Sequence, residues 1–306
     1  MSSLAPLAIT GGTGFVGHAV IAEACRTRVP LRALARRDPE PCEGVEWLRG
    51  DLADLGALAR LVAGTAAVLH IAGVVSAPDP VAFHAGNVAG TQAVVDAARR
   101  AGVERFIFVS SLAAREPGLS AYGRSKCDAE EVVRSSGLDW VIVRPPAIYG
   151  PQDREILELF RAARWGVVPM PPAGRTSVVH VRDLARLLLA LTNPSDLASR
   201  QIYEPDDGRP QGWSHRELGK AIGAAVGRRV WVPNLPRGVL SSAARLDRLV
   251  RGDRAKLTQD RVGYMAHPDW TCSPEKAPPG TLWRPEISTR QGLAETARWY
   301  REAGWL

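Results

Sequence analysis

A tyrosine and a lysine stand four residues apart in the stretch AYGRSKCDAE, which runs from Ala121 to Glu130. Residues at this spacing share one side of a helical turn, so a helix here places the Tyr122 phenol beside the Lys126 ammonium. A neighbouring cation lowers the pKa of a phenol from about 10 toward the range in which it exchanges protons. Only four of the 39 basic residues are lysines, so this lysine points to acid–base chemistry rather than to general basicity.

A glycine-rich turn, TGGTGFVG, lies between an apolar run and an amphipathic stretch. Gly12, Gly14 and Gly17 fit the dinucleotide fingerprint, and Gly11, Gly14 and Gly17 fit its wider-spaced variant. Such glycines allow a tight turn and let a pyrophosphate approach the backbone at a helix N-terminus. A turn that serves only the fold is the alternative, and the flanking strand and helix patterns favour the dinucleotide.

The end of the second expected strand bears on which dinucleotide binds. An acid there would bind the adenosine ribose of NAD, whereas an arginine favours the 2′-phosphate of NADP. The chain reads LRALARRDPE, with Ala35, Arg36 and Arg37 at the expected strand end. We therefore expect NADP(H) to be favoured over NAD(H). Asp38 leaves NAD(H) as the alternative, because its carboxylate would bind the adenosine ribose if the strand ended three residues later.

Asp51 follows the third expected strand in the stretch RGDLAD. Its carboxylate could accept an adenine amino hydrogen. The alternative is an ordinary helix N-cap, and the two interpretations are compatible.

Strand-like apolar runs alternate with amphipathic stretches through the first half of the chain. The runs are LAIT, LRALA, VEWLRG, AVLHIAG, RFIFVSS and WVIVR. This rhythm predicts an α/β fold: a Rossmann-type, doubly wound parallel sheet with a smaller, mainly C-terminal substrate-binding region. We expect residues 1–150 and 176–205 to form the dinucleotide-binding domain, and residues 151–175 and 206–306 to form the substrate-binding region.

Composition indicates an ordinary globular chain of 306 residues. We find no secretory signal pattern and no apolar run that could span a bilayer, so we expect a cytoplasmic protein. The four cysteines lack metal-ligand spacing, which predicts reduced thiols and no metal site. A net charge of +7 without a nucleic-acid motif predicts an anionic substrate or cofactor and no nucleic-acid partner.

Taken together and in order, these motifs resemble the extended short-chain dehydrogenase/reductase family, also called the NAD-dependent epimerase/dehydratase family, as an atypical NADP-type member. The resemblance covers nearly the whole chain. It includes TGGTGFVG, GDLAD, HIAG, NVAGT, FVSS, AYGRSK, RPPAIYGP, VVHVRDLA and the tail GLAETARWYREAGWL.

The resemblance implies roles for individual residues. Tyr122 matches the family's proton donor, and Lys126 matches the lysine that lowers its pKa and reaches the nicotinamide ribose. Ser111 matches the serine that orients the substrate carbonyl, with Ser110 as the adjacent alternative. Asn87 either positions the site or simply starts a helix. The implied cofactor contacts are Gly11, Gly12, Thr13, Gly14, Phe15, Val16, Gly17, Arg36, Arg37, Asp51, Leu52, Ile71, Ala72, Gly73, Tyr122, Lys126, Pro145 and Ile148; His180 and Asp183 are expected to be architectural.

Three functions are compatible with this resemblance. The first is an NADPH-dependent reductase that interconverts a ketone and a secondary alcohol, on an apolar or lipid-like substrate such as a 3-keto-sphingoid or a ketoceramide. Steroid, flavonoid-like and acyl-thioester carbonyls stay open. The second is a sugar-nucleotide epimerase or dehydratase that retains NAD, and the third is a non-catalytic accessory subunit like those of respiratory complex I. Arg36 and Arg37 favour the reductase.

A basic stretch near residues 237–256 carries an apolar stripe at helical spacing, formed by Val239, Ala243, Leu246 and Val250. We expect this stripe to pack into the core beneath a solvated basic face. The alternative is contact with a membrane surface or with a lipid-like or anionic substrate. We expect a monomer or a homodimer that acts on a small carbonyl compound.

Overall fold

The computed structural model describes residues 5–194, 198–252, 255 and 257–306. The chain divides into two compact units. The first comprises residues 1–144, 184–203 and 278–284, and the second comprises residues 145–183, 204–277 and 285–306.

These units differ in detail from the domains expected from the sequence. Residues 145–150, 176–183 and 204–205 belong to the second unit, and residues 278–284 belong to the first. The strands at Ala147–Tyr149 and Val178–His180 pair with each other, which carries both segments into the second unit. Residues 278–284 are tied to the first unit by the Arg284 carbonyl, which accepts a 3.0 Å hydrogen bond from the Arg186 guanidinium.

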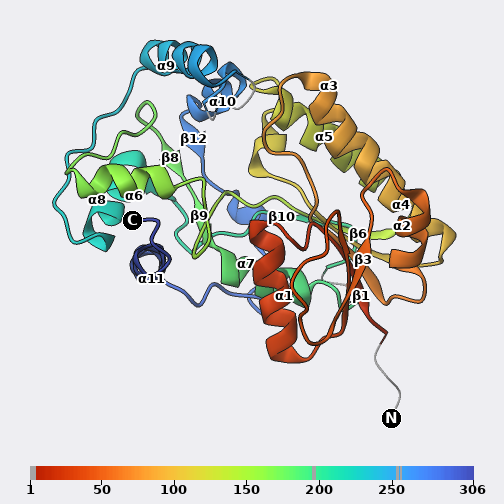
Figure 1. Cartoon of the computed structure of the whole chain (residues 1–306). Coiled ribbons are helices and arrows are strands. Elements are labelled where there is room, and N and C mark those ends of the chain that lie inside the picture. Colours follow the sequence, from red (N-terminus) through yellow and green to blue (C-terminus); the bar gives the residue numbers. More distant parts are fainter. Residues whose placement is uncertain (1–4, 195–197, 253–254, 256) are drawn as a thin grey trace. The chain divides into compact units, whose positions relative to one another are not determined.

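A seven-stranded sheet forms the centre of the first unit (Figure 1). Its strands are β1 (Leu7–Thr10), β2 (Leu31–Ala35), β3 (Val45–Arg49), β4 (Ala67–His70), β5 (Arg105–Val109), β6 (Asp139–Val143) and β10 (Gln201–Tyr203). All neighbours run parallel, in the order β10-β6-β5-β4-β1-β2-β3. The doubly wound Rossmann sheet expected from the sequence is therefore confirmed.

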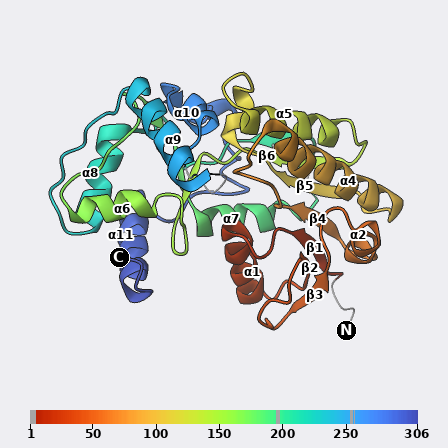
Figure 2. The ribbon, with the colours of Figure 1, turned by 45° about the horizontal axis from the view of Figure 1, so that its top comes forward.

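Helices cover both faces of this sheet. They are α1 (Phe15–Thr27), α2 (Leu55–Val62), α3 (Pro80–Phe83), α4 (Gly90–Arg100), α5 (Ala121–Arg134) and α7 (Val181–Ala190), with a π-helical segment at His84–Ala89 and a 3₁₀ turn at Leu112–Arg115. The helices α2, α4 and α5 pack on one face, where their apolar side chains join those of the strands in one core. The helix α1 covers the opposite face (Figure 2).

Burial on both faces explains why the central strands β1, β4 and β5 are mainly apolar runs. Ile9, Val68, Ile107 and Ile142 are fully or almost fully buried. A strand that faced water on one side would alternate apolar and polar residues instead. The switch in strand order falls between β1 and β4, so the loops that follow these two strands diverge and leave room for a ligand at their carboxyl ends.

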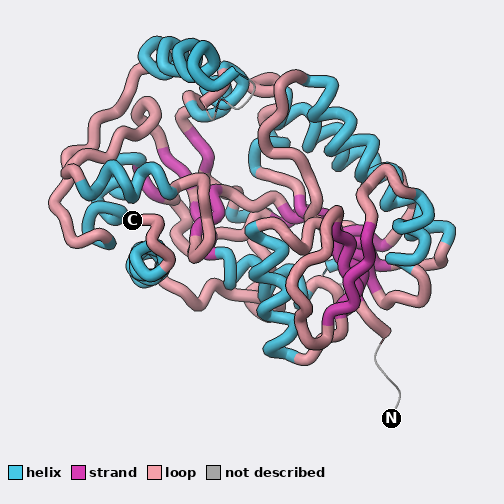
Figure 3. The backbone as a smooth tube through the Cα atoms, in the orientation of Figure 1, coloured by secondary structure: helices cyan, strands magenta, loops and turns pink. Residues whose placement is uncertain are grey.

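The second unit combines short strands with helices and long loops (Figure 3). Its strands are β7 (Ala147–Tyr149), β8 (Arg175–Thr176), β9 (Val178–His180), β11 (Trp213–Ser214) and β12 (Asp269–Trp270). Its helices are α6 (Leu157–Arg164), α8 (His215–Ala225), α9 (Arg237–Arg251), α10 (Gln259–Met265) and α11 (Thr289–Glu302), with a 3₁₀ turn at Pro274–Lys276. A separate core that includes Phe160, Ile222, Leu293 and Tyr300 holds this unit together.

The apolar stripe expected to pack into the core of α9 is exposed instead. Val239, Leu246 and Val250 are 50%, 62% and 75% exposed. Leu240 and Ala244 are the buried residues of this helix, because α10 covers that side. The core-stripe prediction was therefore wrong. Within the described ranges, no helix has the length and apolar character needed to cross a membrane.

Candidate active site

The turn between β1 and α1 has the geometry of a phosphate-binding loop. Gly11 adopts φ 76°, and a Cβ there would lie 2.6 Å from the Ala72 nitrogen. A Cβ at Gly17 would lie 2.1 Å from the Gly11 oxygen. The Gly14 N–H donates a 3.0 Å hydrogen bond to that same oxygen and closes the turn. Any side chain at position 11 or 17 would have to displace backbone atoms, so both positions require glycine.

The start of α1 fits a dinucleotide pyrophosphate. Its N-cap, Gly14, offers no side-chain hydrogen bond, and the first turn of the helix contains no acidic residue. Thr13 and Gly14 are exposed, while Phe15 and Val16 are half-buried. The first amide groups of the helix and the positive end of its dipole are thus available to an anion.

The strand β2 ends at Ala35, as the sequence predicted. Arg36, Arg37 and Asp38 follow directly and are all exposed. Ala35 is 4% exposed and brings no carboxylate to the strand end. Arg36 and Arg37 are therefore the first residues after the strand end at which a ribose acid is found in NAD-binding sites.

Asp51 is not the N-cap of α2. Asp54 caps this helix by accepting a 2.9 Å hydrogen bond from the Ala57 N–H. Asp51 accepts a 2.9 Å bond from the Ala53 N–H and is exposed. Leu52 packs half-buried against the core. The helix-cap interpretation is thereby excluded, and the contact of Asp51 with adenine stays a prediction.

Tyr122 and Lys126 lie on the first turns of α5, as their spacing predicted. Ser120 caps this helix, accepting a 2.9 Å hydrogen bond from the Gly123 N–H. Lys126 is 4% exposed, and burial lowers the pKa of its ammonium to about 8, although the negative charge of Glu130 opposes this shift. Tyr122 is half-buried, with its ring centroid 6.0 Å from that of Phe83.

Ser110 and Ser111 have different surroundings, which separates the two serines that the sequence left open. Ser110 is 6% exposed, and its hydroxyl donates a 2.6 Å hydrogen bond to Glu130. Ser111 is half-buried and caps the next 3₁₀ turn, accepting a 3.2 Å bond from the Ala113 N–H. Accepting this bond leaves the Ser111 proton for another acceptor. Ser111 therefore has the more accessible hydroxyl.

A buried ion pair lies one turn beyond Lys126, and no motif in the sequence predicted it. Glu130 is fully buried and faces Arg144 in two hydrogen bonds of 2.8 and 2.6 Å. Such paired bonds hold a carboxylate and a guanidinium in one plane. The only local signal of this ion pair in the sequence is Glu130, four residues after Lys126, because Arg144 follows the end of β6.

Asn87 links the loop after β4 to α5 and is not a helix-starting residue. It lies in the π-helical segment, 2% exposed. Its amide oxygen accepts a 2.7 Å bond from the Val74 N–H, and its amide nitrogen donates to Val74 O at 2.9 Å and to Ser125 at 2.8 Å. Ser125 in turn donates a 2.8 Å bond to the Tyr122 carbonyl. A Cβ at Gly73 would lie 3.5 Å from the Lys126 ammonium, so this loop runs past the lysine.

His70, at the end of β4, had no predicted role, yet it lies beside these residues. Its ring nitrogens lie 2.6 Å from the Thr10 hydroxyl and 3.0 Å from the Thr91 hydroxyl. Burial, together with the positive charge of Lys126, lowers the pKa of His70 to about 3. The imidazole is therefore neutral near pH 7. The neighbouring residues Ile71 and Ala72 bond to Thr10 and border the Gly11 turn.

Four residues of the predicted set belong to the second unit: Pro145, Ile148, His180 and Asp183. Asp183 accepts backbone hydrogen bonds from Glu286 and Ile287, the latter at 3.0 Å. His180 is 1% exposed, and its ring packs edge-on against Tyr149. These contacts fit the architectural role expected of both residues. The placement of Pro145 and Ile148 beside the nicotinamide stays a prediction.

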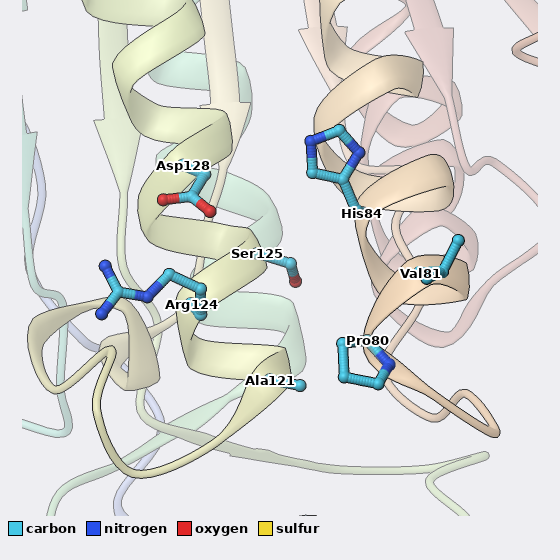
Figure 4. Close-up of a pocket in the computed structure, with 7 residues that line it drawn as sticks. All are labelled: Pro80, Val81, His84, Ala121, Arg124, Ser125 and Asp128. Carbon is cyan, nitrogen blue, oxygen red and sulfur yellow. The ribbon is translucent and has the colours of Figure 1, made fainter.

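A groove of about 400 Å³ lies between α5 and the helical segment that contains Pro80, Val81 and His84 (Figure 4). It is lined by Pro80, Val81, His84, Ala121, Arg124, Ser125 and Asp128. Ser125 connects it to the Asn87 network, whereas Lys126 points into the unit. Among the residues that the structure describes, no cluster of His, Cys, Asp and Glu could hold a metal ion, and the four cysteines are free thiols.

Comparison with known proteins finds a matching family model, similar sequences named as reductases and solved structures with the same fold. Residues 11–193 match a family model described as NAD(P)H-binding. A protein named ceramide reductase from Caulobacter vibrioides is 37% identical, covering 98% of this chain and 96% of its own length. A 2-alkyl-3-oxoalkanoate reductase from Stenotrophomonas maltophilia is 29% identical, covering 93% and 96%. Among solved structures, MoeE5 in complex with UDP-glucose and NAD shares the fold, with a TM-score of 0.76, 22% identity and coverage of 97% and 99%.

Proposed function

The chain belongs to the NAD(P)H-binding family of extended short-chain dehydrogenases/reductases, and from this premise we propose that it is an NADPH-dependent ketoreductase acting on an apolar, lipid-like substrate. The observation that carries the proposal is the buried Lys126 one helical turn from Tyr122, with Ser111 as the accessible serine after β5. A binding module without catalysis has no need to keep an ammonium buried.

In the proposed reaction, a nicotinamide cofactor, when bound, would supply a hydride to the carbonyl carbon of the substrate. Tyr122 donates its phenolic proton to the carbonyl oxygen, so the ketone becomes a secondary alcohol and the phenol becomes a phenolate. The positive charge of Lys126 stabilises this phenolate, which then recovers a proton from water. Ser111 donates a hydrogen bond to the carbonyl oxygen as negative charge develops on it.

The surroundings of Lys126 support this assignment. Its ammonium donates a 2.8 Å hydrogen bond to the Val109 carbonyl and lies 4.4 Å from the centroid of the Phe108 ring. Both contacts favour the charged form, which burial alone would disfavour. Asn87 and Ser125 fix the start of α5 through the Tyr122 carbonyl, so they act as positioning residues.

The preference for NADPH is supported by Arg36 and Arg37 at the end of β2. A guanidinium binds a phosphate dianion through paired hydrogen bonds, and Ala35 places no competing carboxylate beside it. NADPH is the form of the cofactor that a net reduction would consume.

The names of two relatives support the substrate class. One is named as a reductase of ceramide and the other as a reductase of 2-alkyl-3-oxoalkanoates. Both names suit a ketone on a long apolar compound, such as a ketoceramide or a 3-keto-sphingoid.

The test combines cofactor oxidation with product mass. We expect the purified chain to oxidise NADPH when given a ketoceramide or a 3-keto-sphingoid in detergent micelles, and to yield the corresponding alcohol. Tyr122→Phe should abolish this turnover and leave NADPH affinity intact. Conversion of a nucleotide sugar without net NADPH oxidation would overturn the proposal. A fully active Tyr122→Phe variant would overturn the assignment of the proton donor.

A further inference from the structure

The helix α9 presents a row of aliphatic side chains to solvent. Val239, Leu246, Leu249 and Val250 are 50%, 62%, 84% and 75% exposed. Val239, Leu246 and Val250 follow helical spacing and share one side of the helix, and Leu249 adjoins them. Scattered exposed aliphatics are ordinary, but four on one 15-residue helix form a continuous patch.

Folding does not require this patch, because another side of α9 holds the helix in place. Leu240 and Ala244 pack against Val262 of α10 in a small core of their own. Asp247 accepts a 2.9 Å hydrogen bond from the Leu257 N–H, which further connects α9 to the chain that leads to α10. Figure 1 shows α9 at the margin of the second unit with α10 beside it. The patch thus faces away from its supporting helix.

Arginines accompany the patch along the whole helix. Arg237, Arg245, Arg248 and Arg251 are all exposed, against a single acid, Asp247. That acid is half-buried and already bonded to the Leu257 N–H, with Arg251 at 3.3 Å. The exposed surface of α9 therefore has aliphatic side chains on one side and an excess of positive charge on another, as in helices that lie in a membrane interface.

We propose that α9 docks on the surface of a bilayer that contains anionic lipids. The helix is about 22 Å long, so it can lie flat with its aliphatic row at the acyl boundary and its guanidiniums at the lipid phosphates. The charge excess matches phosphodiesters, which arginine binds through paired hydrogen bonds. A protein-binding hot spot would instead be enriched in tryptophan or tyrosine, and the patch has neither. The inference rests on α9 alone and not on the proposed reductase activity.

The test uses the full chain and vesicles, without cofactor or substrate. Sedimentation with vesicles of phosphatidylcholine containing phosphatidylglycerol should show binding at least about tenfold tighter than with phosphatidylcholine alone, and added salt should weaken it. The variant Leu246→Ser/Leu249→Ser/Val250→Ser should lose binding to both vesicle types. The variant Arg245→Gln/Arg248→Gln/Arg251→Gln should lose only the preference for anionic vesicles.

Leu55→Ser is the matched control, since Leu55 is 60% exposed on a helix of the first unit. We expect it to bind vesicles like the wild type. Thermal unfolding and NADPH binding of every variant show whether the fold is intact. Absence of wild-type binding, or equal binding by the serine variant, overturns the proposal. Self-association that the serine variant abolishes, without vesicle binding, assigns the patch to a protein interface and overturns it too.

Discussion

The Lys126 ammonium donates a 2.8 Å hydrogen bond to the backbone oxygen of Val109, the last residue of β5. This contact ties the helix with the tyrosine–lysine pair to the strand that leads into Ser111. The Phe108 ring, whose centroid lies 4.4 Å from the ammonium, further restricts the space around it. A compact ammonium fits this space, whereas the planar fork of a guanidinium needs more room.

Lys126→Arg should therefore lose activity although it keeps the charge. We expect kcat/KM for ketone reduction to fall by about a hundredfold or more, because the guanidinium displaces the start of α5 and the tyrosine on it. Steady-state kinetics and the melting temperature measure the two effects separately. Near wild-type activity in Lys126→Arg would show that positive charge alone is sufficient.

The pH dependence of the reaction should reflect Glu130. Burial lowers the pKa of Lys126 to about 8, and the negative charge of Glu130 keeps it from falling further. Activity should thus decline above about pH 8 as the ammonium loses its proton, and Glu130→Gln should move this decline to lower pH. The pH profile of kcat/KM checks the shift.

Glu131→Gln is the control for this variant, because Glu131 is the next residue on α5 and is exposed. Removing the Glu130 carboxylate also breaks its buried ion pair with Arg144, at a cost of about 3–5 kcal/mol of stability. Profiles must therefore be recorded below the melting temperature of each variant. If kcat/KM declines at the same alkaline pH in Glu130→Gln and in the wild type, Glu130 does not influence the pKa of Lys126.

Arg36→Ala should weaken the binding of NADPH and spare that of NADH. Loss of a charged hydrogen bond to the 2′-phosphate costs about 1.5–3 kcal/mol, and NADH lacks this phosphate. Fluorescence titration of both cofactors measures the difference. Asp38→Ala provides the opposite test, since a selective loss of NADH affinity in that variant would assign the ribose to Asp38 and favour NAD.

Local patterns were sufficient to predict the sheet and the tyrosine–lysine pair. The strands β1, β4 and β5 are buried along their whole length, so each appears in the sequence as a mainly apolar run. Tyr122 and Lys126 lie on the same side of α5 because they are one helical turn apart. The cap of α2 is Asp54, whereas the sequence offered Asp51 as one of two interpretations, since several turn residues in RGDLAD could each start a helix.

Contacts between distant segments could not be predicted in this way. Glu130 meets Arg144, and His70 meets Thr10 and Thr91, only after the strands have aligned. The periodicity of α9 predicted a helix correctly but assigned its buried side wrongly. Which side is covered depends on where α10 packs, and spacing within α9 contains no information about that.

Gly17→Ala should impair both folding and cofactor binding. The added methyl group would lie 2.1 Å from the Gly11 oxygen and 2.7 Å from Gly12 backbone atoms, so the turn must open. We expect a lower melting temperature and a loss of NADPH affinity of about tenfold or more. Gly118→Ala is the control, because a Cβ at Gly118 meets nothing within 4 Å. A Gly17→Ala variant that binds NADPH normally would refute the requirement for glycine.

The stability of the fold in acid should depend on His70. Burial lowers its pKa from 6.5 to about 3, so the folded imidazole stays neutral while the unfolded chain takes up a proton below pH 6.5. Stability from this group is complete above pH 6.5 and is lost as the pH falls toward 3. The loss amounts to about 1.4 kcal/mol per pH unit.

His70→Gln removes the titrating group. Between pH 6 and pH 4, the slope of the free energy of unfolding against pH should therefore decrease by the contribution of one proton. Other groups titrate in the same range: burial lowers the pKa of His180 to about 4, which has the same sign, and raises that of Asp153 to about 7, which has the opposite sign. His180 and Asp153 contribute equally in the wild type and in the variant. The difference between the slopes of the two proteins therefore measures the contribution of His70 alone. Urea unfolding at several pH values measures these slopes, and parallel curves would show that His70 is protonated in the folded chain.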